Sequence, residues 1–528
     1  MKRLYKPLAL LLGCLLILSG CCAPAASGSS AAPAASNPGA SAPAPSTLLY
    51  GSGDYTAINP ALYEHGEINL LLFSGLTAHG QDNQIVPALA ESWDYDESSS
   101  TYTFHLRDGV KWHDGEPLTS ADVKFTLEAI MDPQNASEIA SNYEEIASIE
   151  TPDDRTVKIS LTAPNVAMLD YLTIGILPAH LLEGRDLITD PFNQAPVGTG
   201  PYKLTAWDMG QSITLEKNPD YFGGQPQIDT IIFKIVPDTK ARALQLLSGE
   251  LDLAQIVPHD KAQFDGNDQF TVYDMKTADY RGILYNFANP LFRDHRELPA
   301  ALSYAIDRQP IIDSVLMGYG QIAYSPLQAG PYLNPGIEKY DYNPTKAKEQ
   351  LEQAGWETGA DGIYEKNGIR LAFAINCGEG DQVRIDMAKI CAQQLREIGA
   401  DVTVAVNAQT DWANQEAYLI GWGSPFDPDD HTYKVFGTQK GSNFSAYSNG
   451  EVDRLLTEAR ETDDDAKRKA FYNEFQEVLA ADPAYTFIAY VDAIYACDSR
   501  LQGITPDTVL GHHGVGIFWN VASWIFEK

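Results

Sequence analysis

Apolar and polar residues alternate in several short segments of this chain, and the alternation predicts β-strands. Residues 101–107 alternate aromatic or aliphatic side chains with polar ones, which is typical of a strand with one buried face. Residues 157–161 show the same two-residue period. A continuous apolar run over residues 229–237 indicates a third strand, buried on both faces.

Other segments carry apolar residues at helical spacing. Residues 119–130 predict a helix that begins with a capping-box pair, and residues 343–354 predict a helix that begins at an Asn-Pro pair and stops before glycine. Residues 383–398 predict a third helix, followed at once by an apolar strand over residues 402–406. Because strand and helix patterns alternate along the chain, the predicted fold class is α/β.

The N-terminus has the features of a secretory signal. A short basic segment precedes an apolar run over residues 8–18, which is too short to span a bilayer as a helix. The run ends in Leu-Ser-Gly-Cys, which resembles the bacterial lipobox and implies a lipoprotein signal peptide over residues 1–20 and a lipid on Cys21; an ordinary cleaved signal is the alternative. Residues 21–46 are almost entirely Ala, Pro, Ser and Gly, so we expect a disordered tether. The expected location is extracytoplasmic, lipid-anchored to the outer face of the cell membrane.

Composition narrows the possible functions. The 528 residues include 44% hydrophobic and 20% charged residues, an ordinary globular composition, and the length predicts two or more lobes. The formal net charge of −34 repels phosphate backbones, which excludes a nucleic-acid partner. Beyond the N-terminal segment only Cys377, Cys391 and Cys497 remain, too dispersed for a disulfide framework. Their spacing leaves open whether Cys377 and Cys391 are bridged.

A candidate binding segment follows a predicted buried strand over residues 417–420. Glycine, proline, two aromatic residues and three carboxylates occur within the next ten positions, a composition typical of the rim of a ligand cleft. Aromatic rings can provide flat apolar walls, and carboxylates can bind a cationic amine. The candidate ligand-binding residues are Trp422, Ser424, Phe426, Asp427, Asp429 and Tyr433. A proline-rich surface turn is the alternative.

Several short motifs occur in one order between residues 50 and 490. They include Pro-Ala-Leu-Ala-Glu-Ser-Trp at 87–93, Gly-Val-Lys-Trp-His-Asp-Gly at 109–115, Gly-Thr-Gly-Pro-Tyr at 198–202, Asn-Pro-Asp-Tyr at 218–221, Leu-Ser-Tyr-Ala-Ile-Asp at 302–307 and Gly-Trp at 421–422. Together, and behind a lipobox, they resemble the substrate-binding lipoproteins of peptide- and nickel-type ABC importers, family 5 of the bacterial extracellular solute-binding proteins. The resemblance implies a two-lobed periplasmic-binding-protein-like (Venus flytrap) fold with an extra subdomain inserted in the N-terminal lobe.

The resemblance also implies a domain layout and a function. The N-terminal lobe is expected over residues 47–290 with the inserted subdomain at about 85–195, the second lobe over 291–490, and a return to the first lobe over 491–528. The implied protein is a monomeric binding lipoprotein without a cofactor, and not an enzyme. It captures a short peptide or peptide-like solute between its lobes and delivers it to a membrane permease that a cytoplasmic ATPase drives.

One position departs from the peptide-binding pattern. Peptide-binding members of the family often place an aspartate three residues after the Trp of the Gly-Trp pair, where this chain has Pro425. A nickel or nickel-chelate ligand is therefore the alternative, with His65, His431, His512 and His513 as candidate metal ligands. The glycines on both sides of His512 and His513 favour a turn. On a strand, the two adjacent residues would point to opposite faces, a poor arrangement for two metal ligands. A secreted hydrolase is a further alternative, although the sequence contains neither Gly-x-Ser-x-Gly nor His-Glu-x-x-His.

Overall fold

The computed structural model describes residues 46–63, 66–328 and 330–527. The predicted signal peptide, the lipid site at Cys21, the tether up to residue 45 and the candidate metal ligand His65 lie outside these ranges. Within them, no helix is both long enough and apolar enough to cross a membrane.

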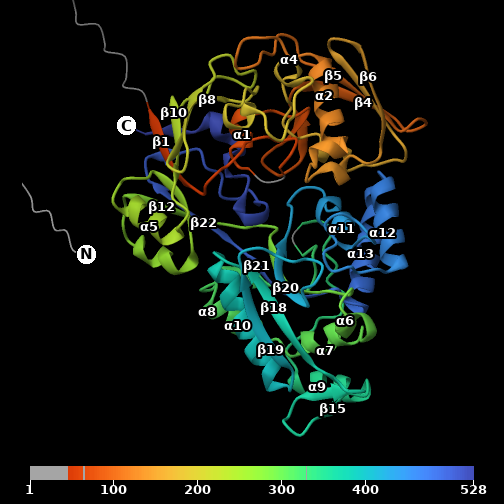
Figure 1. Ribbon diagram of the computed structural model, residues 1–528. Helices are drawn as coiled ribbons and strands as arrows, with labels where there is room; N and C mark the ends of the chain where they lie inside the picture. Colours follow the sequence, from red (N-terminus) through yellow and green to blue (C-terminus); the bar gives the residue numbers. More distant parts are fainter. Residues whose placement is uncertain (1–45, 64–65, 329, 528) are drawn as a thin grey trace, which may run out of the picture. The chain divides into compact units, whose positions relative to one another are not determined.

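Two large apolar cores organise the described residues, each packed against its own main sheet. Figure 1 shows the helices and strands of both sheets. We call residues 46–275 together with 493–527 the first lobe, and residues 280–491 the second lobe. The four-stranded sheet of the predicted inserted subdomain contributes Tyr102, Phe104 and Val157 to the same core as the seven-stranded sheet. The inserted region therefore packs as part of the first lobe.

In its described residues, the first lobe holds two sheets, two small hairpins and five α-helices. The seven-stranded sheet has the order β12 (Phe270–Met275), β22 (Ala493–Asp498), β11 (Leu253–Ile256), β1 (Thr47–Ser52), β10 (Thr230–Ile235), β9 (Ser212–Lys217) and β8 (Tyr202–Asp208). The four-stranded antiparallel sheet has the order β4 (Ala90–Asp96), β5 (Thr101–Leu106), β7 (Thr156–Leu161) and β6 (Ile146–Asp153). The hairpins are β2 (Thr77–His79) with β3 (Ile85–Pro87), and β23 (Leu501–Gln502) with β24 (Ile525–Phe526). The helices are α1 (Asn69–Leu72), α2 (Ser120–Met131), α3 (Met168–Tyr171), α4 (Ala179–Leu182) and α5 (Thr239–Leu247).

The second lobe is a six-stranded mixed sheet with helices packed on it. Its strand order is β14 (Gly320–Ile322), β21 (Tyr485–Val491), β13 (Tyr280–Tyr285), β20 (Ala417–Trp422), β18 (Ala372–Gly378) and β19 (Asp401–Asn407). A small sheet joins β15 (Glu357–Thr358), β16 (Tyr364–Lys366) and β17 (Ile369–Arg370). The helices are α6 (Pro290–Asp294), α7 (Leu298–Tyr304), α8 (Gln309–Ser314), α9 (Pro344–Gln353), α10 (Gln382–Glu397), α11 (Asp429–Phe436), α12 (Gly450–Glu461) and α13 (Asp465–Ala481).

The chain crosses between the two sheets twice, and the two crossings are bonded to each other. Residues 276–279 link β12 to β13, and Asp492 links β21 to β22. Lys276 Nζ lies 2.7 Å from an Asp492 carboxylate oxygen, and Thr277 Oγ1 donates to the Val491 carbonyl oxygen at 2.6 Å. The family resemblance implies that the second lobe begins at residue 291. The first crossing comes earlier, at residues 276–279, because β13 is a central strand of the second sheet. Its burial gives no local signal of which core it joins.

Most of the elements predicted from periodicity are confirmed. The predicted strands at 101–107, 157–161 and 402–406 are β5, β7 and β19, and the helices at 119–130, 343–354 and 383–398 are α2, α9 and α10. The capping-box pair that begins α2 is present. Strand β10 differs from its prediction, because its side chains alternate between buried and half-buried positions.

The Gly-Thr-Gly-Pro run at residues 198–201 packs closely against the backbone of α1. A Cβ at Gly198 would overlap the Leu72 carbonyl oxygen of α1, and a Cβ at Gly200 would overlap that of Leu71. The imidazole of His113 holds the same loop, because its Nδ1 accepts from the Gly198 N–H and its Nε2 donates to the Gly200 carbonyl oxygen, both at 3.1 Å. Glycine is therefore required at both positions, because the backbone of α1 passes too close to leave room for a side chain.

The Gly198→Ala variant should be less stable by about 3 kcal/mol, because overpacking against a fixed backbone forces the loop and α1 apart. Chemical denaturation of the purified protein measures the free energy of unfolding. Gly450→Ala is the matched control, since a Cβ at Gly450 meets nothing within 4 Å. Equal stability of the two variants would contradict the close approach.

Stability should also depend on pH through His113. Burial lowers the pKa of its imidazole from 6.5 to about 4. Between these values the unfolded chain binds a proton that the folded protein does not, so the free energy of unfolding should fall as the pH decreases from 6.5 toward 4. At pH 5 the loss is about 2 kcal/mol. In a pH series of denaturation curves, the free energy of unfolding of His113→Gln should depend less steeply on pH between 6.5 and 4. An unchanged slope would show that His113 is not the source of the pH dependence.

Candidate ligand-binding site

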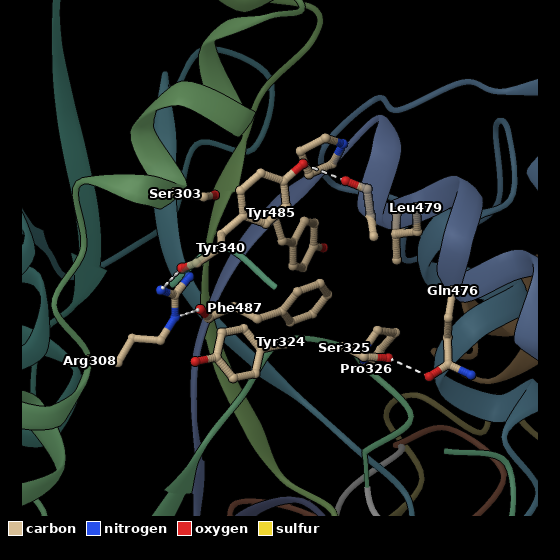
Figure 2. Close-up of a pocket in the computed structure, with 12 residues that line it drawn as sticks. Ser303, Arg308, Tyr324, Ser325, Pro326, Tyr340, Gln476, Leu479, Tyr485 and Phe487 are labelled. Carbon is tan, nitrogen blue, oxygen red and sulfur yellow. Dashed lines mark hydrogen bonds between the residues drawn. The ribbon is translucent and has the colours of Figure 1, made fainter. Parts of the chain in front are cut away.

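One small cavity in the second lobe has no room for a solute. Figure 2 shows its lining, in which the Arg308 guanidinium donates to the backbone carbonyl oxygens of Phe487 and Tyr340 at 2.7 and 2.6 Å. The cavity volume of about 10 Å³ corresponds to a single water molecule. The polar groups of this cavity therefore hold strands and loops of the second lobe together and do not form the binding site.

A charged cluster lies where the first crossing segment enters β13. Asp279 is fully buried, and one of its carboxylate oxygens lies 2.8 Å from His512 Nδ1 while the other accepts from the His513 backbone N–H at 3.0 Å. Arg281 forms an ion pair with the same carboxylate. Burial alone would raise the pKa of Asp279, but the charges of Arg281 and His512 hold it well below its usual value. Asp279 therefore stays ionised.

Two guanidinium groups lie in this cluster. Arg281 projects from β13, and Gly421 makes room for it, because a Cβ at Gly421 would overlap its guanidinium. Arg384 projects from the first turn of α10, where its Nε lies 3.1 Å from an Asp381 carboxylate oxygen. Burial and the nearby charge of Arg281 lower the pKa of Arg384. Arg281 Nε and Arg384 Nη2 are buried and have no hydrogen-bond partner among the described residues. Such donors suit an anionic group, above all a carboxylate.

The histidine pair occupies a turn and not a strand. Residues 512–514 form a short 3₁₀ turn in which His513 has a φ of +58°, and the two ring centroids lie 3.9 Å apart. The turn favoured by the flanking glycines is therefore confirmed, and the strand alternative, with the rings on opposite faces, is not adopted. Burial lowers the pKa of both imidazoles, that of His513 to about 2 with the charge of His512 as a further cause. The charges of Arg281 and Arg384 contribute to both shifts, which places the four side chains in one cluster.

A row of aromatic rings extends from this cluster. Trp422, predicted to bind ligand, lies 6.4 Å from the His512 ring and 6.1 Å from Phe444, in both cases nearly parallel. Phe444 in turn stacks on Trp412 with centroids 4.2 Å apart. The side chains of Trp422, Phe444 and Trp412 are half-buried. The row offers flat apolar surface next to the arginines, which suits the non-ionic part of a solute.

The two predicted carboxylates that follow Trp422 are bound by arginines of the protein. Asp427 makes a bidentate pair with Arg468, with N–O distances of 2.6 and 2.7 Å. Asp429 makes a second bidentate pair with Arg460, at 3.0 and 2.5 Å. The oxygens expected to bind a cationic amine are thus already engaged.

The other predicted residues of this segment also contact protein groups. Phe426 stacks on His79 of the first lobe, with ring centroids 3.5 Å apart, and Arg460 lies over the ring of Tyr433 at 3.5 Å. Ser424 Oγ accepts from the Phe426 backbone N–H at 3.3 Å. The structure therefore brings Trp422 and the histidine pair together and places residues 424–433 in a separate network.

In the part of the chain that the structure describes, the remaining candidate metal ligands form no metal site, and the cysteines form no disulfide. His431 is buried in the second lobe, where desolvation lowers its pKa to about 4. Among the described residues, no group of three or more His, Cys, Asp or Glu side chains is arranged to hold a metal ion. Cys377, Cys391 and Cys497 are free, buried thiols, so Cys377 and Cys391 are not bridged.

Known proteins match nearly the whole chain. The profile described as bacterial extracellular solute-binding proteins, family 5 Middle, matches residues 84–444. The oligopeptide-binding protein AppA of Bacillus subtilis is 31% identical in an alignment that covers 100% of this chain and 99% of AppA. These matches confirm the family resemblance.

Solved structures agree. NikZ from Campylobacter jejuni in complex with Ni(L-His) has a TM-score of 0.85 and 36% sequence identity, covering 91% of this chain and 99% of NikZ. AppA from Bacillus subtilis in complex with a nonapeptide has a TM-score of 0.82 and 30% identity, with the same coverage of each chain. The predicted two-lobed α/β fold is therefore confirmed, and the chain belongs to family 5 of the bacterial extracellular solute-binding proteins.

Proposed function

We propose that this protein captures a short peptide or peptide-like solute by its carboxylate and passes it, chemically unaltered, to the permease of an ABC importer. The observation that supports this most directly is the pair of buried guanidinium groups, Arg281 and Arg384, with N–H groups that have no hydrogen-bond partner in the described part of the chain. The aromatic row beside them supplies a surface for the apolar part of the solute. Similarity to AppA, which is named as oligopeptide-binding, supports a peptide as the solute.

The proposed cycle uses the two lobes. Solute that contacts both lobes favours the arrangement in which they are close together, and it shifts the population toward that state. Moving such an equilibrium from 1:99 to 99:1 takes about 5.5 kcal/mol of differential binding. Charge-assisted hydrogen bonds to two arginines, together with stacking on Trp422, can supply free energy of this order.

The location and partners are part of the same proposal. Lipid on Cys21 would anchor the protein at the outer face of the membrane, and residues 21–46 would let a monomeric binding body reach the permease, which a cytoplasmic ATPase drives. The family supports an extracellular binding protein of an importer. The matching relatives are binding proteins, which supports a role without catalysis.

Replacing Arg384 should weaken peptide binding strongly. Arg384→Gln removes a cationic donor to the solute carboxylate, and the expected loss of affinity is about 10- to 100-fold. Native mass spectrometry with a pool of tri- to nonapeptides would identify bound peptides, and calorimetry would measure their dissociation constants. Arg396→Gln, at the exposed far end of the same helix, is the matched control. C-terminally amidated peptides that bind as tightly as free acids would overturn carboxylate recognition.

The histidine pair supports a second candidate, a nickel chelate. Neutral imidazoles are the ligands that nickel accepts readily, and the lowered pKa values of His512 and His513 keep them neutral at physiological pH. The neighbouring arginines could bind the carboxylate of an amino acid that completes the coordination of the metal. Similarity to NikZ, solved in complex with Ni(L-His), supports this alternative.

This candidate predicts that nickel binds the protein well only together with L-histidine. After dialysis against Ni²⁺ with L-histidine, elemental analysis should find nickel on the protein, whereas Ni²⁺ alone should leave far less. The double variant His512→Ala with His513→Ala should retain less than about a tenth of the metal. His259→Ala, which removes an exposed histidine of the first lobe, is the control. Nickel retained equally by the double variant would exclude the pair as its ligands.

A further inference from the structure

The segment that follows Trp422 binds the first lobe. Tyr171, the last residue of α3, donates its hydroxyl to Asp429 at 2.5 Å, and Arg460 Nη1 lies 2.6 Å from a Glu145 carboxylate oxygen. Tyr171 and Glu145 belong to the first lobe, whereas Asp429 and Arg460 belong to the second. We call these four residues the interlobe clamp.

Backbone and ring contacts extend the clamp on both sides. The Val166 N–H donates to the Arg460 carbonyl oxygen at 3.0 Å, and the Asp427 N–H donates to an Asp170 carboxylate oxygen at 3.3 Å. The Phe426 ring lies flat on His79 with an interplanar angle of 2°. The contacts between the lobes here are therefore specific in geometry.

The clamp is also desolvated. The exposed fraction of the side chain is 4% for Arg460, 1% for Asp429 and 17% for Glu145. A buried ion pair is stable only when the remaining donors and acceptors are also satisfied. Asp429 receives two hydrogen bonds from Arg460 and one from Tyr171, and Arg460 reaches a second carboxylate only through Glu145. The first lobe thus completes a charge network whose other half is already present in the second lobe.

We infer that the interlobe clamp sets the balance between separated and joined lobes, and thereby the solute affinity, without contacting the solute. This inference rests on the proposed function only in that lobe closure serves solute binding. When the lobes separate, Arg460 and Asp429 keep each other but lose Glu145 and Tyr171. The clamp therefore favours the joined arrangement independently of any solute, and the carboxylates of Asp427 and Asp429 act in lobe contact and not in amine recognition.

Two conservative variants test this inference. Tyr171→Phe removes one hydroxyl and keeps the ring, and Glu145→Gln removes one charge from a partly exposed position. Glu458→Gln is the matched control. Glu458 lies in α12, the helix that carries Arg460, but it pairs with Arg454 on the exposed face of that helix and so makes its contact within one lobe. Near-ultraviolet circular dichroism would establish that each variant is folded.

Small-angle scattering without added solute gives the decisive measurement. Tyr171→Phe, Glu145→Gln and their combination should show a larger radius of gyration than the wild type and Glu458→Gln. With the peptide pool described above, each single variant should bind about tenfold more weakly. An unchanged radius of gyration in the folded double variant would overturn the clamp. A wild type that binds no peptide would overturn the proposed function but would leave the solute-free difference in size intact, so the two failures are distinguishable.

Discussion

The buried carboxylate of Asp279 is the constraint on which the site depends. A charge in this position is tolerated only if it is fully paired, and its partners come from distant parts of the chain. Arg281 lies two residues away, whereas His512 and the His513 backbone N–H belong to the C-terminal segment, more than 230 positions along the sequence. One carboxylate thus joins the segment between the two main sheets to the turn that carries both histidines.

Local structure was largely predictable from the sequence because it depends on neighbouring residues. A two-residue period with β-branched and aromatic side chains specified β5 and β7, and the Asn-Pro pair specified the start of α9. The assignment of β13 to the second lobe could not be predicted in the same way. Its six residues are buried on both faces, and burial of this kind is equally compatible with either core.

The site was predictable in part, for a related reason. Trp422 could be found because a buried strand ends next to it in a Gly-Trp pair. Arg281 and Arg384 gave no such signal, since a buried guanidinium is recognisable only from what surrounds it. Asp427 and Asp429 were expected to face a solute, but their arginine partners lie 41 and 31 positions further along the chain, beyond the reach of local patterns. The turn at His512 and His513 could be anticipated from the flanking glycines, whereas the positive φ of His513 cannot be deduced from the residue type.

The three described cysteines have a practical consequence. Cys377, Cys391 and Cys497 are buried, and desolvation raises the pKa of each thiol to about 12. Nucleophilic reaction with maleimides requires a thiolate and access to it, and these side chains offer neither. The thiols of the described residues should therefore not react with such reagents while the protein is folded. A cysteine introduced on each lobe surface would therefore accept a fluorophore or spin label in preference to these three native thiols.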